Sequence, residues 1–277
     1  MGADEVDTSA LSDELRRVPM REGTALELLR VLDQPDVSAS GVAQRVGTDP
    51  VLAARCLHLA NSPYFGVGGR VGELNQAVVL LGISVIRALA LTTAAGLFVD
   101  PKRMPDGFWD HSVAVAAASS LLARHRGLPV GEAFSAGLLH DVGAALLFRY
   151  DRERYDIVLT AAGHDEARQC ALERAVFGLE HGEAGAIALA AWGLPGYLVE
   201  AVRQHHADLD AITEPLALLV SGGEAVTAVM VRDDPGVADR LDVALMAAGL
   251  EGVPSASIVE QLRAEILRLD GLFATAA

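Results

Sequence analysis

Near the middle of the chain is the sequence Phe134-Ser-Ala-Gly-Leu-Leu-His140-Asp141-Val-Gly-Ala-Ala-Leu-Leu-Phe148, in which a histidine and an aspartate stand side by side among apolar residues. The apolar pattern predicts a buried helix from about Gly131 to Phe148. Burying an ionisable pair is costly unless each group finds a partner or a metal ion. The pair therefore predicts a polar pocket inside a hydrophobic core, with its other side chains supplied from elsewhere in the chain.

Candidate partners for this pair lie on other predicted helices. His111 falls at helical spacing with Val115, Ala118 and Leu122, which places it on a buried face. His205 shares a face with apolar residues of its own helix in the same way. The remaining candidates are His181, His206 and Glu224. Imidazoles and carboxylates that converge from several helices are typical of metal sites, and an internal hydrogen-bonded network is the alternative.

The composition favours an all-α protein. Aromatic residues make up only 5% of the 277 residues, so the core must consist of Ala, Leu and Val at helical spacing. The net charge of -15 repels phosphate backbones, so we expect no general nucleic-acid binding. The acidic start carries no signal-peptide pattern, and Cys56 and Cys170 have no metal-ligand spacing, which indicates reduced thiols in a cytoplasmic protein.

A long apolar run from Ala77 to Val99 raises the question of a membrane span. Arg87 lies near its middle and Gly82 interrupts it. A span needs about 20 uninterrupted apolar residues, so we interpret this run as two buried helical segments and expect no membrane contact.

The helical pattern divides the chain into two halves. We expect a flexible lead-in over residues 1–14, an amino-terminal helical bundle over 15–100, a linker over 101–107 and a second helical bundle with closing helices over 108–277. Two short helices within 38–60 allow a DNA-binding helix-turn-helix using Arg45, Arg55 and His58, but their apolar character favours an ordinary hairpin. The glycine-rich segment 66–72 lacks the features of a phosphate-binding loop and reads as a surface loop.

Several strings resemble those of HDOD proteins, the HD-related output domains of bacterial signalling. In the first half these are Leu59-Ala-Asn-Ser-Pro-Tyr-Phe-Gly and Ala77-Val-Val-Leu-Leu-Gly-Ile. In the second half they are Phe108-Trp-Asp-His-Ser, Ala136-Gly-Leu-Leu-His-Asp-Val-Gly and Phe177-Gly-Leu-Glu-His-Gly-Glu-Ala-Gly, followed by His205-His206. The resemblance covers about residues 15 to 270 and implies an all-α fold of the HD superfamily of metal-dependent phosphohydrolases.

The resemblance also implies a set of metal ligands. His111, His140 and Asp141 match the HD pattern, and Glu224 aligns with its later aspartate, one methylene longer. These residues would hold a first divalent ion (Mn, Fe, Ni or Zn), and His181, His205 and His206 would hold a second ion or contact a phosphate. The related HD-GYP enzymes carry a glutamate where this chain has Gly107, and their Gly-Tyr-Pro signature is absent.

The resemblance implies a regulatory role in bacterial signal transduction. We expect a non-catalytic output module that binds a protein partner or a small-molecule ligand, and a homo-oligomer is left open. The alternative is a metal-dependent phosphohydrolase that acts on a nucleotide or a phosphodiester. The substitution at Glu224 and the missing carboxylate at Gly107 favour the first reading, because catalytic ligands must be placed to within about 0.5 Å.

Overall fold

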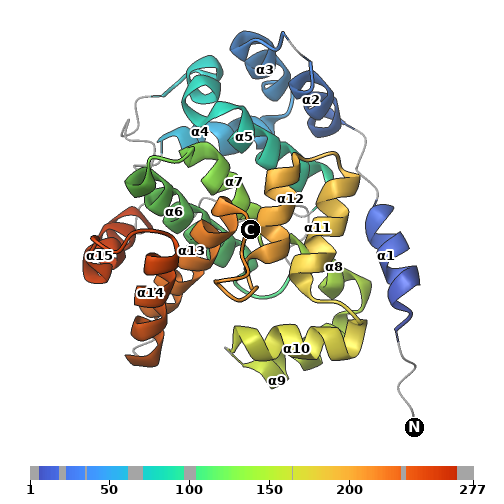
Figure 1. Cartoon of the computed structure of the whole chain (residues 1–277). Helices are drawn as coiled ribbons and strands as arrows, with labels where there is room; N and C mark the ends of the chain where they lie inside the picture. The colour runs from blue at the N-terminus through green and yellow to red at the C-terminus, as the bar shows by residue number, and fades with distance from the viewer. Residues whose placement is uncertain are drawn as a thin grey trace.

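The computed structural model describes residues 6–18, 23–34, 36–61, 71–96, 104–163, 165–231 and 235–266, and every regular element in these ranges is a helix. The predicted all-α class is therefore confirmed. Figure 1 shows the amino-terminal bundle at the top of the molecule and the larger second bundle below it. The first bundle consists of α2 (Thr24–Leu32), α3 (Ala39–Val46), α4 (Pro50–Asn61) and α5 (Leu74–Ala94).

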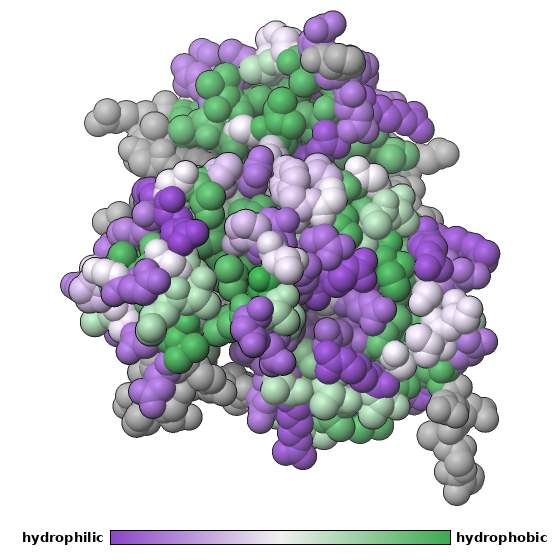
Figure 2. Space-filling model, viewed as in Figure 1, coloured by the Kyte–Doolittle hydropathy of each residue, from purple (hydrophilic) through white to green (hydrophobic). Residues whose placement is uncertain are grey.

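The second bundle contains the remaining long helices. They are α6 (Phe108–Arg126), α7 (Val130–Leu139), α8 (Val142–Tyr150), α9 (Arg152–Ala162), α10 (Glu166–Phe177), α11 (His181–Ala191), α12 (Gly196–Gln204), α13 (Pro215–Val231), α14 (Pro235–Ala247) and α15 (Ser255–Ile266). On the face shown in Figure 2, hydrophobic residues reach the surface over the amino-terminal bundle, whereas hydrophilic residues gather across the centre below it.

Helix α5 carries the apolar run and is divided as its sequence predicts. Gly82 has φ of 77°, a left-handed conformation that glycine adopts without strain, and it separates two helical segments. Within the described residues this is the one helix long and apolar enough to cross a membrane, but 61% of its most apolar window is buried inside the protein. Its apolar surface is therefore largely used in packing against the other helices.

Helix α4 is the second helix of the predicted hairpin and belongs to the scaffold. It buries Leu52, Cys56 and Leu59 in the main core. Arg45, on the preceding helix, pairs with Glu27 of α2 at 2.6 Å. Both observations favour a structural hairpin over a base-reading helix.

Helix α6 is the central support of the second bundle, with α7 and α13 packed against it. The backbones of α6 and α7 approach closely, because a Cβ on Gly137 would lie 2.7 Å from the Cα of Ala116. This contact brings the start of α6, with His111, toward the end of α7, with His140.

The predicted continuous helix from Gly131 to Phe148 is wrong at its centre. Helix α7 ends at Leu139, and Asp141 leaves the helical region with φ of -94° and ψ of 9° before α8 begins. Helix α8 packs against a different neighbour, α11. The two backbones are so close that a Cβ on Gly143 would clash with the carbonyl oxygen of His181. Packing against this second partner requires a change of direction, and the change falls at the His-Asp pair.

The predicted flexible lead-in is also wrong for part of its length. Helix α1 (Thr8–Arg16) begins there, with the side chain of Asp7 accepting hydrogen bonds from the amides of Ser9 and Ala10. Leu11 and Leu15, four residues apart, are 0% and 2% exposed in a second core cluster with Leu147. This burial holds α1 against the second bundle.

Some predictions concern residues outside the described ranges. These are most of the glycine-rich loop (66–70), part of the linker (101–103) and the turn histidine His164. The division of the chain into domains at 14, 100 and 107 stays a prediction.

Candidate metal centre

The structure brings all the predicted ligands together in one place. His111 lies near the start of α6, and the His140-Asp141 pair lies between α7 and α8. The others come from the first residue of α11, the two residues after α12 and the middle of α13: His181, His205, His206 and Glu224. Six helices thus contribute to one polar cluster. The His140-Asp141 pair, which stands among apolar residues, predicts such a cluster.

Asp141 is the centre of the cluster because both of its carboxylate oxygens face histidines. Its Oδ2 lies 3.3 Å from Nε2 of His140 and 3.6 Å from Nε2 of His111. Its Oδ1 lies 3.3 Å from Nε2 of His181 and 4.0 Å from Nε2 of His205. The side chain makes no capping bond to α8, so it is available to the histidines on both sides.

Glu224 joins the same cluster from α13. Its Oε1 lies 3.7 Å from Nε2 of His140 and also 3.7 Å from Nε2 of His206. His111 differs from its prediction, because its side chain is 40% exposed and faces a cavity instead of packing in the core.

The histidine rings are held by their second nitrogens. Nδ1 of His140 lies 2.7 Å from the carbonyl oxygen of Gly137, and Nδ1 of His205 lies 2.6 Å from that of Val202. A carbonyl oxygen can only accept, so both Nδ1 atoms donate. In the neutral ring that binds a metal ion, the lone pair is then on Nε2, which is directed at the cluster. This arrangement is the one that metal-bound histidines use.

Glu173 on α10 holds His181 and was not among the predicted residues. Its carboxylate is 0% exposed and accepts hydrogen bonds from the backbone amide and Nδ1 of His181, at 2.8 and 2.6 Å. Tyr155 and Gln169 donate to its other oxygen, at 2.6 and 3.0 Å. One sequence signal could have found it: Glu173 lies three residues after Cys170 and four before Phe177, on an apolar helix face.

The charges of the cluster follow from burial and from neighbouring groups. Burial alone would raise the pKa of Asp141, but His140, His181 and His111 hold this pKa well below its usual range. Burial raises the pKa of Glu224 well above its usual range, and the carboxylates of Glu166 and Asp141 raise it further. A carboxyl group in this position needs a nearby cation to stay ionised.

The two adjacent histidines are neutral for the same reason. Burial lowers the pKa of His205 and of His206 well below the usual value, and the neighbouring histidines lower both further. Neutral imidazole is the form that binds a metal ion.

The cluster fits one or more divalent metal ions. In the described part of the chain, Nε2 of His181 and Nε2 of His205 are buried and have no hydrogen-bond partner. Ligand atoms about 2.1 Å from one ion lie roughly 3.0–3.4 Å apart, close to the separations measured around Asp141. Mixed imidazole and carboxylate ligands suit Mn, Fe, Ni and Zn.

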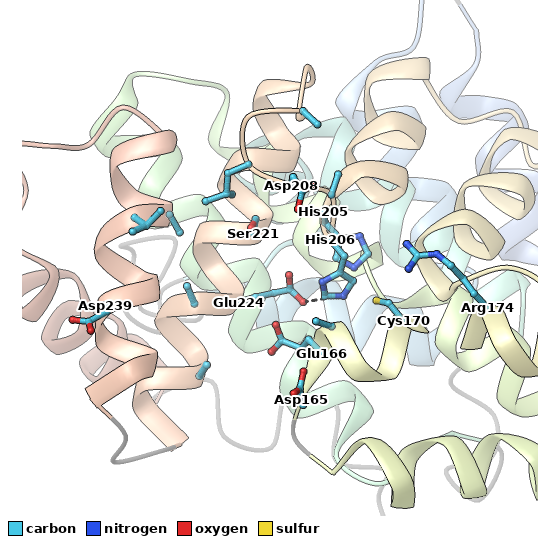
Figure 3. Close-up of a pocket in the computed structure, with 18 residues that line it drawn as sticks. Asp165, Glu166, Cys170, Arg174, His205, His206, Asp208, Ser221, Glu224 and Asp239 are labelled. Carbon is cyan, nitrogen blue, oxygen red and sulfur yellow. Dashed lines mark ion pairs between the residues drawn. The ribbon is translucent and has the colours of Figure 1, made fainter. Parts of the chain in front are cut away.

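Two cavities border the cluster. An inner cavity of about 260 Å³ is lined by His111, Asp141, His181 and Gly107, among others. A larger chamber of about 910 Å³ lies beyond His205 and His206 (Figure 3). The chamber is large enough for a small-molecule ligand next to the candidate metal ions.

Comparison with known proteins places this arrangement in a family. The model of the HDOD domain matches residues 18–208, more than two thirds of the chain. This chain belongs to the HDOD family. The match includes all the candidate ligands except Glu224, and it confirms the resemblance that the sequence strings indicate.

Two solved structures resemble this HDOD protein over nearly its whole length. A "Putative phosphohydrolase" from Shewanella amazonensis SB2B is 26% identical with a TM-score of 0.73, covering 96% of both chains. An "HDOD domain protein with unknown function" from Geobacter sulfurreducens is 26% identical with a TM-score of 0.68, covering 96% of this chain and 98% of the other.

A curated relative is longer than this chain. An "Uncharacterized protein" of Treponema pallidum (strain Nichols) is 23% identical over 203 residues, which are 72% of this chain and 39% of the relative. The chain therefore spans about two fifths of the length of the curated relative that it matches.

Proposed function

We propose that this HDOD protein is a regulatory module of bacterial signal transduction that holds divalent metal ions in its core and binds a small phosphorylated ligand beside them. One observation carries the proposal. The Nε2 atoms of His140, His181 and His205 converge on Asp141, while their Nδ1 atoms are fixed by Gly137, Glu173 and Val202. Fixing the tautomer in this way serves metal binding better than it serves a hydrogen-bonded core.

The proposed ligand follows from the chemistry of the site. When bound, a divalent ion supplies a Lewis acid that attracts phosphate oxygens. Protein side chains offer little other attraction for a phosphate here, because Arg174 is the one lysine or arginine among the described residues lining the two cavities, and it pairs with Glu180. Phosphate binding should therefore depend on the metal.

Metal analysis of the purified protein tests the proposal. We expect bound Mn, Fe, Ni or Zn, a melting temperature that rises on addition of the metal, and loss of both in His140→Ala. His125→Ala is the matched control, because His125 is exposed in the last turn of α6, away from the cluster. A protein that stays metal-free, with no change in melting temperature on adding any of these metals, would contradict the proposal.

A second candidate function is a metal-dependent phosphohydrolase. The complete ligand cluster beside an open chamber favours it, as does the 26% identical structure named "Putative phosphohydrolase". In that case Asp141 and the histidines would position the metal ions, which would activate a water molecule against the bound phosphate. Metal-loaded protein incubated with nucleotide and phosphodiester panels separates the two functions: binding without product supports the module, and product formation that Asp141→Asn abolishes supports the enzyme.

The regulatory role also implies a partner protein in the cytoplasm. We infer that the signal passes through a surface contact with a protein partner or with a second copy of the chain. Size-exclusion chromatography and a pull-down, each with and without metal and phosphate, test this inference. A protein that is monomeric and retains no partner in every condition would contradict it.

A further inference from the structure

Arg174 lines the outer chamber, and its side chain is accessible from there. The side chain is 56% exposed and extends from α10 toward the side of the chamber that carries His205 and His206 (Figure 3). Guanidinium groups bind carboxylates and phosphates through paired N–H donors. An anionic group of a molecule in the chamber can therefore reach Arg174.

Glu180 holds the guanidinium of Arg174 in place. The two side chains form an ion pair between Nη2 of Arg174 and Oε2 of Glu180. This oxygen is buried and accepts no hydrogen bond within the described part of the chain. A buried carboxylate that lost its cation would be strongly destabilising, so Arg174 should keep this pairing when a ligand binds.

The ion pair leaves part of the guanidinium available to a ligand. A guanidinium has five N–H donors, and one carboxylate engages two of them at most in the usual fork geometry. The pairing cancels the net charge, so Arg174 by itself attracts a free phosphate weakly. It can still donate to an anionic group that a ligand held elsewhere in the chamber brings to it, because the second contact is then intramolecular.

Arg174 lies close to the candidate metal centre. Cys170, one helical turn earlier on α10, lines the same chamber, and its Sγ lies within 4.8 Å of ligand atoms of Glu173 and His181. Glu180, the partner of Arg174, immediately precedes His181 in the sequence. A ligand with one phosphate at the metal ions can thus present a second group to Arg174.

Other walls of the chamber carry negative charge. Asp239 on α14 is an exposed carboxylate on the far side from Arg174 (Figure 3). Asp165 also lines the chamber, and its Oδ1 accepts a hydrogen bond from the backbone amide of Arg168. Like charges repel, so the anionic groups of a ligand should lie between the metal centre and Arg174.

We propose that Arg174 binds a second anionic group of the ligand, so that the chamber selects small organic molecules with two separated phosphates, or with a phosphate and a carboxylate. The inference rests on the proposed function and extends it. The metal ions hold the first phosphate, and Arg174 adds a second contact that a molecule with a single phosphate cannot make.

Titration calorimetry of the metal-loaded protein with fructose 6-phosphate and fructose 1,6-bisphosphate tests the inference. The two probes differ by one phosphate on a flexible sugar. We expect the unmodified protein to bind the bisphosphate about tenfold more tightly or better, because a hydrogen bond to a charged group contributes about a factor of ten or more. Arg174→Gln should remove this preference and leave the affinity for fructose 6-phosphate unchanged.

Two further variants serve as controls. Arg174→Lys keeps a positive charge beside the buried Glu180 but lacks the planar fork, so it should fold, bind fructose 6-phosphate normally and lose most of the preference. Arg168→Gln removes one positive charge from an exposed position of the same helix that does not line either cavity. It should keep the full preference, and thermal melts should show all three variants folded.

The outcomes separate this inference from the proposed function. If the metal-loaded protein binds neither inorganic phosphate nor either sugar phosphate, both fail. If it binds inorganic phosphate but does not prefer the bisphosphate, the role of Arg174 alone is refuted. A preference that persists in Arg174→Gln, or that is lost equally in Arg168→Gln, would also refute it, because the second phosphate would then be bound elsewhere or by general electrostatics.

Discussion

Replacing Glu173 by glutamine tests how the candidate metal centre is held in place. The buried carboxylate accepts two hydrogen bonds from His181 on one oxygen and bonds from Tyr155 and Gln169 on the other. In Glu173→Gln one oxygen becomes an amide group that donates. The new amide group needs an acceptor. The Tyr155 hydroxyl can rotate to accept from it, and the Gln169 side chain can turn so that its carbonyl oxygen accepts, whereas the backbone amide of His181 can only donate. The new oxygen should therefore stay with His181.

The expected loss of stability follows from the charge removed from these bonds. Hydrogen bonds to charged groups contribute about 1.5–3 kcal/mol and neutral ones about 0.5–1.5 kcal/mol. The two bonds to His181 should each lose about 1 kcal/mol, which lowers the free energy of unfolding by about 2 kcal/mol. In a chain of 277 residues that corresponds to a fall in melting temperature of roughly 3–4 °C. Metal affinity should fall by roughly 10–100-fold, because His181 is less firmly held.

Urea unfolding of the metal-free protein and Mn²⁺ titration measure the two effects separately. Tyr155→Phe is the control, because it removes one donor from the other oxygen of Glu173 and leaves the bonds to His181 in place. It should cost about 1.5–3 kcal/mol, because the lost bond is to a charged group, with little change in metal affinity. Unchanged affinity in Glu173→Gln, or an equal loss of affinity in Tyr155→Phe, would refute the positioning role of Glu173.

Three further predictions concern charge and packing. Burial would lower the pKa of His181, but Glu173 raises it to about 9. The stability that this proton adds to the metal-free protein is complete below about pH 6.5 and is lost as the pH rises through about 9. Metal binding at pH 8 should therefore release about one proton, which calorimetry in buffers of different ionisation enthalpy measures; no proton release would contradict this. Gly143→Ala should lower the free energy of unfolding, measured in urea, by about 1–3 kcal/mol, because the added Cβ would clash with the His181 carbonyl oxygen. Wild-type stability of this variant would argue against the close α8–α11 contact. Leu11→Ala should cost about 2–5 kcal/mol and speed hydrogen exchange in α1, and unchanged exchange there would argue against the docking of this helix.

The helices could be predicted because their signals are local. The spacing of Leu and Val residues, the prolines at helix starts and the glycines at helix ends are signals within a few residues of each other, as Pro215 at the start of α13 and Gly178 at the end of α10 illustrate. The conformational break at Gly82 is local in the same sense. The candidate ligands came from apolar faces that carry a histidine and from the family strings, and the structure brings them all together.

Contacts between distant segments determine what the sequence could not predict. The helix break at His140-Asp141 depends on α8 packing against α11, which lies about 40 residues away in sequence. The lead-in folds as α1 because Leu11 and Leu15 find a second core cluster, and Thr8 lies against Phe177. In each case local propensity permits more than one conformation, and burial against a remote surface selects one.

The same distinction applies within the metal centre. The sequence by itself determined an all-α chain with buried histidines and an adjacent His-Asp pair that required partners. Only the tertiary structure decided that Asp141 lies between two sets of histidines, that Glu173 fixes the ring of His181, and that Glu166 stands beside Glu224. The physical reason is that spacing along a helix assigns a side chain to a face, whereas the faces that meet are set by the packing of the whole core.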